Sequence, residues 1–215
     1  MKKCGGERIK IMENGPYMVF GDIPLKGEAI ERDEEGRSVR WTETKKHYPD
    51  GVYALCRCGN SANKPFCNAD HSDFDGTETA PRSTYDECSY IIPRSEDVGY
   101  QQSPMFCTRS EFCHGRVDVA KAAANKETLD AAIERTHHCA GGSVVINVDG
   151  KKQEPCLEKS ISAAASFGDA GPLRVRGGIP VESSDGYVYE VRNRVALCRC
   201  GKSLNKPFCD TSHMR

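Results

Sequence analysis

The sixteen residues CRCGNSANKPFCNADH at positions 56–71 recur, with 11 positions unchanged, as CRCGKSLNKPFCDTSH at positions 198–213. Both copies have the pattern Cys-x-Cys, then eight residues before a third Cys, and three residues before a His. Thiolate and imidazole groups at fixed spacing are ligands for soft metals. The repeat therefore predicts two metal sites with three cysteines and one histidine each, and such sites can stabilise a small fold.

The spacing within the first copy predicts how its ligands meet. Cys56 and Cys58 are two residues apart, so in an extended strand both side chains point to one side. Pro65 has a fixed φ and no N–H, which suits the first turn of a helix. On such a helix Cys67 and His71, four residues apart, share one face. The second copy presents the same arrangement with Cys198, Cys200, Pro207, Cys209 and His213.

Spacing alone leaves two kinds of metal site open. Structural zinc sites usually place about two to four residues between the first two cysteines, and the single residue between Cys56 and Cys58 is tight for that geometry. A two-iron cluster instead takes two ligands on each iron. The pair Cys56/Cys58 suits one iron and the pair Cys67/His71 suits the other. Zinc sites that only staple the fold are the alternative.

The repeat extends upstream of the cysteines. Gly15–Leu25 aligns with Gly171–Val181, and both segments open with Gly-Pro and close with Ile-Pro and an aliphatic residue. Apolar runs between turn residues predict short strands in each unit. In the first unit we expect strands at Tyr17–Phe20, Ser38–Thr42 and Tyr53–Leu55 and a turn at Glu34–Gly36. In the second unit we expect strands at Leu173–Val175, Tyr187–Val191 and Val195–Leu197 and a turn at Ser184–Gly186.

A segment of different character separates the two units. Helical periodicity predicts a helix over Lys126–His138, and a shorter helix is expected over Val117–Ala124. A β-branched run predicts a strand over Ser143–Val148, whereas the small, polar stretch Ser160–Gly171 is typical of a linker. The predicted domains are residues 1–78, 79–160 and 161–215. One unit of about 50 residues buries little core alone, so we expect the two repeats to pack on each other.

Composition excludes several classes of function. The 215 residues carry 30 basic and 31 acidic side chains, a net charge of −1 that argues against nucleic acid or an anionic membrane as a partner. No apolar run approaches the roughly 20 residues of a membrane span, and Met1–Met18 lacks the apolar core of a secretory signal. Twelve cysteines without an export signal favour metal ligands over disulfides and a cytoplasmic location. No phosphate loop or catalytic-triad motif is recognisable, so we do not expect an enzyme.

The two motifs resemble those of the CDGSH iron–sulfur proteins, the NEET family. Ser61 and Ser203 match the hydroxyl of the family motif, Pro65 and Pro207 match its proline, and the Gly-Pro strands resemble its β-cap strand. The resemblance covers roughly residues 9–71 and 171–213. It implies two [2Fe-2S] clusters, with Cys56, Cys58, Cys67 and His71 as the ligands of one and Cys198, Cys200, Cys209 and His213 as the ligands of the other.

The resemblance also implies the architecture. Family members with a single motif pair two chains, so a chain with two motifs is expected to form that pair within itself. The fold class is then α+β, with two small β-rich units paired as an intramolecular pseudo-dimer and an α/β segment inserted between them. Such a chain can be a monomer.

The two motifs depart from the family pattern in different ways. The Asp-Gly of the family motif is Asn68-Ala69 in the first copy and Asp210-Thr211 in the second. Asn68 can mimic the acceptor of an aspartate but carries no charge, so we expect the two clusters to differ in potential and lability. The loss of glycine indicates that a positive φ is not required at Ala69 or Thr211.

The insert resembles a divergent mono-cluster ferredoxin domain. Cys107 and Cys113 form a C-x5-C pair, and Cys139 follows the predicted helix, with Ala140 in place of the proline of that family. The resemblance implies a [4Fe-4S] or [3Fe-4S] cluster bound by these three cysteines. Candidates for a fourth ligand are Cys88, Cys156, His114 and His138. The alternative is a degenerate domain in which the cysteines are merely small buried residues.

These features predict an iron–sulfur protein that acts in electron transfer or redox sensing. A cluster with one histidine ligand should have a potential between those of plant-type ferredoxins, at about −400 mV, and Rieske centres, at about −150 to +300 mV. The expected partner is a redox protein or a protein that accepts a cluster. The alternatives are a cluster storage or transfer protein and a zinc-stapled interaction module.

Overall fold

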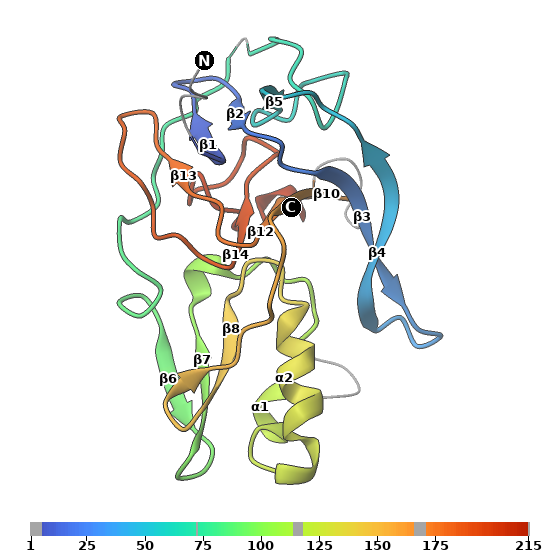
Figure 1. The fold of residues 1–215 in the computed structure, drawn as a ribbon, viewed down its shortest axis with the longest axis vertical. Coiled ribbons are helices and arrows are strands. Elements are labelled where there is room, and N and C mark those ends of the chain that lie inside the picture. The colour runs from blue at the N-terminus through green and yellow to red at the C-terminus, as the bar shows by residue number, and fades with distance from the viewer. Residues whose placement is uncertain (1–5, 72, 114–117, 166–170, 215) are drawn as a thin grey trace.

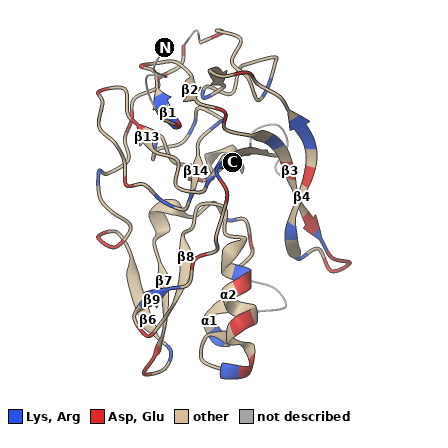
Figure 2. Ribbon diagram, viewed as in Figure 1, with Lys and Arg blue, Asp and Glu red and all other residues tan. Residues whose placement is uncertain are grey.

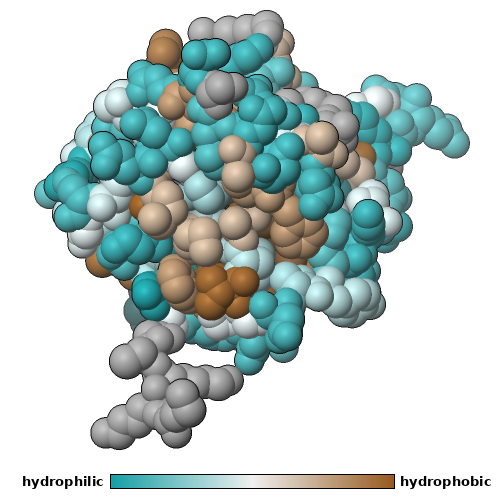
Figure 3. Space-filling model, turned by 90° about the horizontal axis from the view of Figure 1, so that it is seen from above, coloured by the Kyte–Doolittle hydropathy of each residue, from teal (hydrophilic) through white to brown (hydrophobic). Residues whose placement is uncertain are grey.

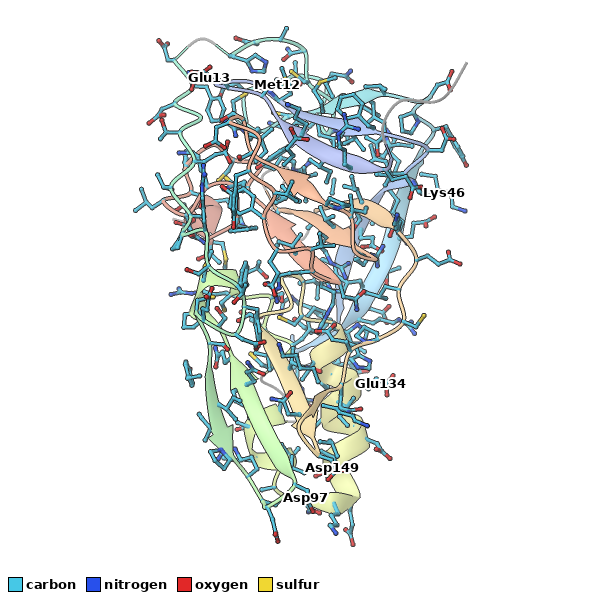
Figure 4. The ribbon with its side chains drawn as sticks, turned by 60° about the vertical axis from the view of Figure 1, so that its left-hand side comes forward. Met12, Glu13, Lys46, Asp97, Glu134 and Asp149 are labelled. Carbon is cyan, nitrogen blue, oxygen red and sulfur yellow. The ribbon has the colours of Figure 1, made fainter. Side chains whose placement is uncertain are left out.

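The structure, a computed structural model, describes residues 6–71, 73–113, 118–165 and 171–214. The two repeated units form two β-sheets at one end of the molecule, and the insert extends away from them as a third sheet with two helices (Figure 1). Asp97 and Asp149 lie at the far end of the insert, whereas Met12 and Glu13 lie at the opposite end of the molecule (Figure 4).

The first sheet has the strand order β13-β1-β2-β5. Its strands are β1 (Arg8–Ile11), β2 (Tyr17–Phe20), β5 (Tyr53–Leu55) and β13 (Val181–Glu182). Burial alternates along β2, where Tyr17 and Val19 face the core, as a sheet with one buried face requires. The predicted strands at 17–20 and 53–55 are confirmed, and the second of them leads into the first motif.

The second sheet has the order β14-β12-β10-β3-β4. It contains β3 (Leu25–Arg32), β4 (Ser38–His47), β10 (Ser160–Ala164), β12 (Leu173–Arg176) and β14 (Arg194–Leu197). The strands predicted at 38–42, 173–175 and 195–197 are confirmed, the first with a longer extent than expected. The turns at 34–36 and 184–186 are also present. The hairpin of β3 and β4 projects from the body of the molecule (Figure 1).

The two repeats exchange strands. β13 of the second repeat pairs in parallel with β1, and β3 of the first repeat pairs in parallel with β10. The contacts are equivalent: the Ile9 N–H donates to the Pro180 carbonyl over 2.9 Å, and the Ile161 N–H donates to the Pro24 carbonyl over 2.9 Å. The matching Ile-Pro segments therefore direct each chain segment into the sheet of the other repeat.

Three sequence predictions are wrong in this region. Ser160–Gly171 is not simply a linker, because Ser160–Ala164 forms β10, a buried strand in the middle of the second sheet; residues 166–170 lie outside the described part. Tyr187–Val191 is not a strand and makes only a bridge between Val188 and Glu182. No helix begins at Pro65 or Pro207 in the described parts of the motifs, and only the short 3-10 helix η3 (Ser212–Met214) follows at the end of the second motif; both prolines follow cis peptide bonds, and Phe66 and Phe208 instead form a β-bridge with the preceding strand.

A shared core joins the two repeats. Its buried side chains come from both sheets and from the insert, which contributes Tyr85, Phe106 and Val145. Because neither repeat has a core of its own, each depends on the other for most of its apolar burial. The expectation that the repeats pack together is borne out by this single cluster.

The insert has its own smaller core. Its sheet has the order β6-β7-β8-β9, and α1 and α2 pack on it through Val119 and Ala132. The bounds are β6 (Tyr90–Pro93), β7 (Val98–Gln102), η1 (Pro104–Phe106), α1 (Val119–Ala122), η2 (Lys126–Thr128), α2 (Leu129–His137), β8 (Val144–Val148) and β9 (Lys151–Lys152); η3 (Ser212–Met214) lies in the second repeat. The predicted helix over 126–138 and the strand over 143–148 are confirmed. The shorter helix is present as α1, capped by the Asp118 side chain, and residue 117 lies outside the described part.

Basic and acidic residues are interspersed along the chain. Basic and acidic residues alternate along the β3–β4 hairpin and along α1 and α2 (Figure 2). The face seen from above in Figure 3 is mostly hydrophilic, with apolar side chains gathered near its centre. None of the helices in the described ranges is long and apolar enough to cross a membrane.

Candidate metal centres and the insert cysteines

The first ligand pair of each motif follows the end of a strand. β5 ends at Leu55, and Cys56 and Cys58 come next with their Sγ atoms 3.8 Å apart. Gly59, at a φ of 86°, then turns the chain so that its N–H donates to the Cys56 sulfur over 3.3 Å. The Asn60 N–H donates to the Cys58 sulfur over 3.4 Å. Backbone donors of this kind stabilise negative charge on thiolates.

The second ligand pair is presented by a loop. The Cys67 N–H donates to the Ala54 carbonyl over 2.9 Å, which fixes this cysteine beside β5. The chain then turns through Ala69, whose N–H donates to the Cys67 sulfur over 3.2 Å. This turn brings His71 back, so that its Nε2 lies 3.2 Å from the Cys67 sulfur. A loop, in place of the predicted helix, thus brings the side chains of Cys67 and His71 together.

The predicted serine positions hold this loop in shape. The Ser61 hydroxyl donates to the Phe66 carbonyl over 2.6 Å and accepts from the Asn63 N–H over 3.1 Å. Ser203 makes the same two contacts in the second motif, at 2.7 and 3.0 Å. Replacement of either hydroxyl leaves a buried carbonyl without this partner.

The second motif repeats the arrangement. The Cys198 and Cys200 sulfurs lie 3.7 Å apart, and the Cys209 sulfur lies 3.7 Å from Nδ1 of His213, which belongs to η3. The Thr211 N–H donates to the Cys209 sulfur over 3.4 Å. All eight predicted ligands therefore occur as close pairs, two pairs in each motif.

The pair distances fit tetrahedral metal coordination. Two sulfurs on one tetrahedral metal with bonds of about 2.3 Å are about 3.8 Å apart. In the described part of the chain, however, no three Cys, His, Asp or Glu side chains converge on a single ion position. Ligands that occur as close pairs suit a two-metal cluster, in which each metal takes one pair.

A buried arginine anchors the chain between the first two ligands. Arg57 is 1% exposed, and its Nη2 donates to the Gly76 carbonyl over 2.6 Å. Its guanidinium lies over the rings of Tyr17 and Phe74, at 5.7 and 5.1 Å from their centroids. Because successive side chains of an extended segment point to opposite sides, Arg57 faces away from the side shared by Cys56 and Cys58.

The thiols must lose protons before they bind metal. Burial raises the pKa of Cys209 to about 12. In the adjacent pair Cys198 donates to Cys200, which lowers the pKa of Cys200 and raises that of Cys198. Metal binding at this site is therefore coupled to proton release.

The two motifs touch each other through their glycines. A Cβ at Gly59 would lie 2.9 Å from the Cys200 carbonyl oxygen, and a Cβ at Gly201 would clash with the Cys58 carbonyl oxygen. In addition, the buried Tyr17 hydroxyl donates to the Cys198 carbonyl over 2.9 Å. The first repeat therefore supports the ligand loop of the second, a role of Tyr17 that spacing within a motif could not reveal.

Burial differs between the two ligand loops. Asn68, Ala69 and Asp70 are exposed, whereas Thr211 and Ser212 at the equivalent positions are buried, at 3% and 9% exposure. His71 and His213 are both half-buried. The second site is thus the better protected of the two.

The insert brings its three predicted cysteines together. Cys107, Cys113 and Cys139 line one small enclosed cavity between the loop that follows η1 and the C-terminal end of α2. Of the candidates for a fourth ligand, Cys88, Cys156 and His138 do not line this cavity, and His114 lies outside the described residues. The sequence missed Thr108, which lines the cavity with a buried hydroxyl.

Comparison with known proteins agrees with the duplicated site. A family model described as an iron-binding zinc finger of CDGSH type matches the chain twice, over residues 14–72 and 170–214. No curated protein and no solved structure gives a significant match. Each matched region contains one complete set of three cysteines and one histidine. The chain therefore carries two iron-binding domains of the CDGSH type, one over each motif, and such domains imply an iron–sulfur protein.

Proposed function

We propose that the chain binds two [2Fe-2S] clusters and acts in one-electron transfer or redox sensing. The first cluster would be held by Cys56, Cys58, Cys67 and His71, and the second by Cys198, Cys200, Cys209 and His213. The observation that carries the proposal is the pairing of ligands in each motif, at 3.8 and 3.2 Å in one and 3.7 and 3.7 Å in the other. Such a cluster supplies one-electron chemistry when bound.

The chain's own residues set the properties of these sites. N–H groups of Gly59, Asn60, Ala69 and Thr211 donate to ligand sulfurs, and hydrogen bonds to sulfur raise the reduction potential of a cluster. The half-buried histidines leave one edge of each site near solvent, where a redox partner protein can approach.

We further propose that the two repeats form an intramolecular pseudo-dimer and that the chain works as a monomer. The exchange of β3 and β13, the common core and the contact of Gly59 with Cys200 support this arrangement. Each feature places within one chain a contact that two single-motif chains would have to make between them.

A second function is favoured by the exposed loop of the first site. Because Asn68, Ala69 and Asp70 lie at the surface, the first cluster can be reached by an acceptor protein. Storage and transfer of a cluster from this site is therefore the alternative to electron transfer. Transfer to an apo-ferredoxin under oxidising conditions, from the first site and not from the second, would favour it.

The test of the main proposal is a histidine-to-cysteine exchange at each site. We expect His71→Cys and His213→Cys each to retain a [2Fe-2S] cluster and to lower the potential of the altered site, because a thiolate adds negative charge. Redox titration followed by visible and EPR spectra measures both effects. A colourless protein that binds zinc and no iron would overturn the proposal.

A further inference from the structure

The segment that follows the first motif continues to the ligand loop of the second motif. Residues 74–80, called here the connecting segment, begin beside a proposed ligand, because the Phe74 N–H donates to the His71 carbonyl over 3.1 Å. At the other end of the segment, the Thr79 N–H donates to the Lys206 carbonyl over 2.8 Å. One short segment therefore joins the two proposed metal sites.

The Thr79 side chain strengthens the attachment to the second motif. Its hydroxyl donates to the Leu204 carbonyl over 2.8 Å and accepts from the Lys206 N–H over 3.1 Å. Both partners lie in the loop between the second and third cysteines of that motif. The connecting segment is therefore hydrogen-bonded along the loop that presents Cys209.

Arg57 links the connecting segment to the first ligand pair. It stands between Cys56 and Cys58, and its Nη2 donates to the Gly76 carbonyl over 2.6 Å. A Cβ at Gly76 would collide with this guanidinium and would lie 2.9 Å from the Asn14 Cα, so the segment can come this close because the residue is glycine. A metal bound by the two cysteines fixes the backbone on both sides of Arg57. Occupancy of the first site therefore affects how firmly the connecting segment is held.

Tyr17 makes a second connection between the sites. The Arg57 guanidinium lies over its ring, 5.7 Å from the centroid. The Tyr17 hydroxyl donates to the Cys198 carbonyl over 2.9 Å and lies 3.2 Å from the Pro207 carbonyl, and both carbonyls belong to the second motif. The aligned residue of the second repeat is Leu173, which has no hydroxyl and cannot make the equivalent bond. This support therefore runs from the first repeat to the second.

We propose that the two sites are coupled, so that metal bound at either site strengthens binding at the other, and that Tyr17 and the connecting segment carry this coupling as positioning elements. The inference rests on the proposal that both motifs bind metal, but not on the kind of metal. Metal at the first site orders the backbone around Arg57, and through it Tyr17 and the connecting segment, which hold the second ligand loop in its binding geometry. Because a coupling free energy is reciprocal, metal at the second site also favours retention at the first.

Iron loss to a chelator from the full-length, anaerobically purified protein measures the coupling. The phase that belongs to the first site is the one that disappears in Cys67→Ser. We expect this phase to be at least about fivefold faster in Cys209→Ser, in which the second site is empty, than in the wild type, in which that site is still loaded. Cys200→Ser empties the same site and should give the same acceleration. An unchanged first-site rate in these variants would overturn the inference.

A double-mutant cycle tests the route of the coupling. Tyr17→Phe/Thr79→Ala removes the side-chain hydrogen bonds of both connections and keeps the buried ring. In this background the acceleration caused by Cys209→Ser should fall below about twofold. Tyr17→Phe alone, which needs no emptied site, should also speed iron loss from the second site, although Tyr17 belongs to the first repeat. Full acceleration in the double variant, or an unchanged second-site rate in Tyr17→Phe, would contradict this route.

Two control variants remove comparable hydrogen bonds that do not join the repeats. Tyr53→Phe removes a buried bond to the Ile23 carbonyl within the first repeat. Asn205→Ala removes a bond from the second ligand loop to the Met105 carbonyl of the insert. Each control should keep the full acceleration on emptying the second site. Loss of the acceleration in a control would show that general loosening of the fold, and not the proposed route, controls release.

Failure of this inference is distinguishable from failure of the proposed function. Two [2Fe-2S] clusters that lose iron independently of each other would overturn the coupling alone. A colourless zinc protein would overturn the clusters alone, because the hydrogen bonds of Tyr17 and Thr79 do not depend on the metal. The same cycle would then be measured from zinc release, with the same expected acceleration and the same controls.

Discussion

Two residues in the ligand loops adopt a backbone conformation that glycine prefers. Ala69 has a φ of 63° and Thr211 a φ of 72°, so the expectation that a positive φ is not required at these positions is wrong. The turn is needed because it aims each loop's N–H at the cysteine sulfur. Both loops therefore adopt the left-handed conformation that glycine prefers and accept the strain of a side chain there.

Relief of that strain is measurable at Ala69, which is exposed. We expect Ala69→Gly to raise the free energy of unfolding by about 0.5–1 kcal/mol, since the left-handed conformation costs about 1–2 kcal/mol and the extra unfolded-state entropy of glycine offsets part of this. Anaerobic denaturant unfolding provides the value. Ala62→Gly, at an exposed position in the same motif without a positive φ, serves as the control and should lower stability instead.

The aspartate position accounts for a second difference between the sites. Asp210 accepts from the N–H groups of Ser212 and Leu204, both at 2.9 Å, and so ties the ligand loop to the rest of its motif. Asn68 accepts from Asp70 at 3.3 Å. This supports the expectation, drawn from the sequence, that the two sites differ in lability.

Exchanging the side chains at positions 68 and 210 should exchange the rates at which the two sites lose iron. Iron loss to a chelator is expected in two phases, the faster from the first site. Asn68→Asp should slow the fast phase severalfold, because a carboxylate is the stronger acceptor, and Asp210→Asn should accelerate the slow phase. Cys67→Ser assigns the phases, since only the slow one should remain. A single phase in the wild type, or no response to either exchange, would show that the loops do not control release.

At the scale of elements, the sequence predicted what local patterns determine. β2, β5, β12, β14, α2 and β8 follow from apolar periodicity and turn residues. β10 was missed because Ser160–Ala164 is small and weakly apolar, and its strand conformation depends on pairing with β3, more than 100 residues away in sequence. The helix after each proline was predicted from local propensity, and the pairing of Phe66 and Phe208 with the preceding strands overrides it.

In the candidate site, too, features of the local sequence were predictable and features that depend on the tertiary fold were not. The eight residues proposed as repeat ligands and the three insert cysteines were predicted from spacing and resemblance, because both are properties of the local sequence. Tyr17, Thr108 and the contact of the insert with the second site were not predictable, since they join segments that only the tertiary fold brings together. The difference in burial between the two ligand loops was not predictable for the same reason.

At the scale of the whole molecule, a buried charge cluster links the exchanged strands. Glu28 on β3 of the first repeat is 3% exposed and pairs with Arg174 and Arg176 on β12 of the second repeat. Ser162 on β10 also donates to it. Burial by itself would raise the pKa of Glu28, but Arg174 and these other donors outweigh it and lower the pKa. The folded protein therefore stabilises the ionised form of the Glu28 carboxylate.

This cluster predicts a pH dependence. Because the folded pKa of Glu28 is depressed, its contribution to stability is complete above the unfolded value of about 4.3 and is lost as the pH falls through the folded pKa. We expect Glu28→Gln to cost about 3–5 kcal/mol at neutral pH, since it leaves buried arginines unpaired, and the difference from wild type to shrink below pH of about 4.3. Glu34→Gln, at an exposed residue, is the control and should show neither effect.

The central claim is that each repeat holds one two-iron cluster with a single histidine ligand. The most direct measurement is pulsed EPR of the reduced full-length protein, with Mössbauer spectra to count the clusters. We predict two [2Fe-2S] clusters per chain, each with a nitrogen coupling from a directly bound imidazole, one coupling lost in His71→Cys and the other in His213→Cys. Two clusters without any nitrogen coupling, a single cluster, or a colourless zinc protein would contradict the account.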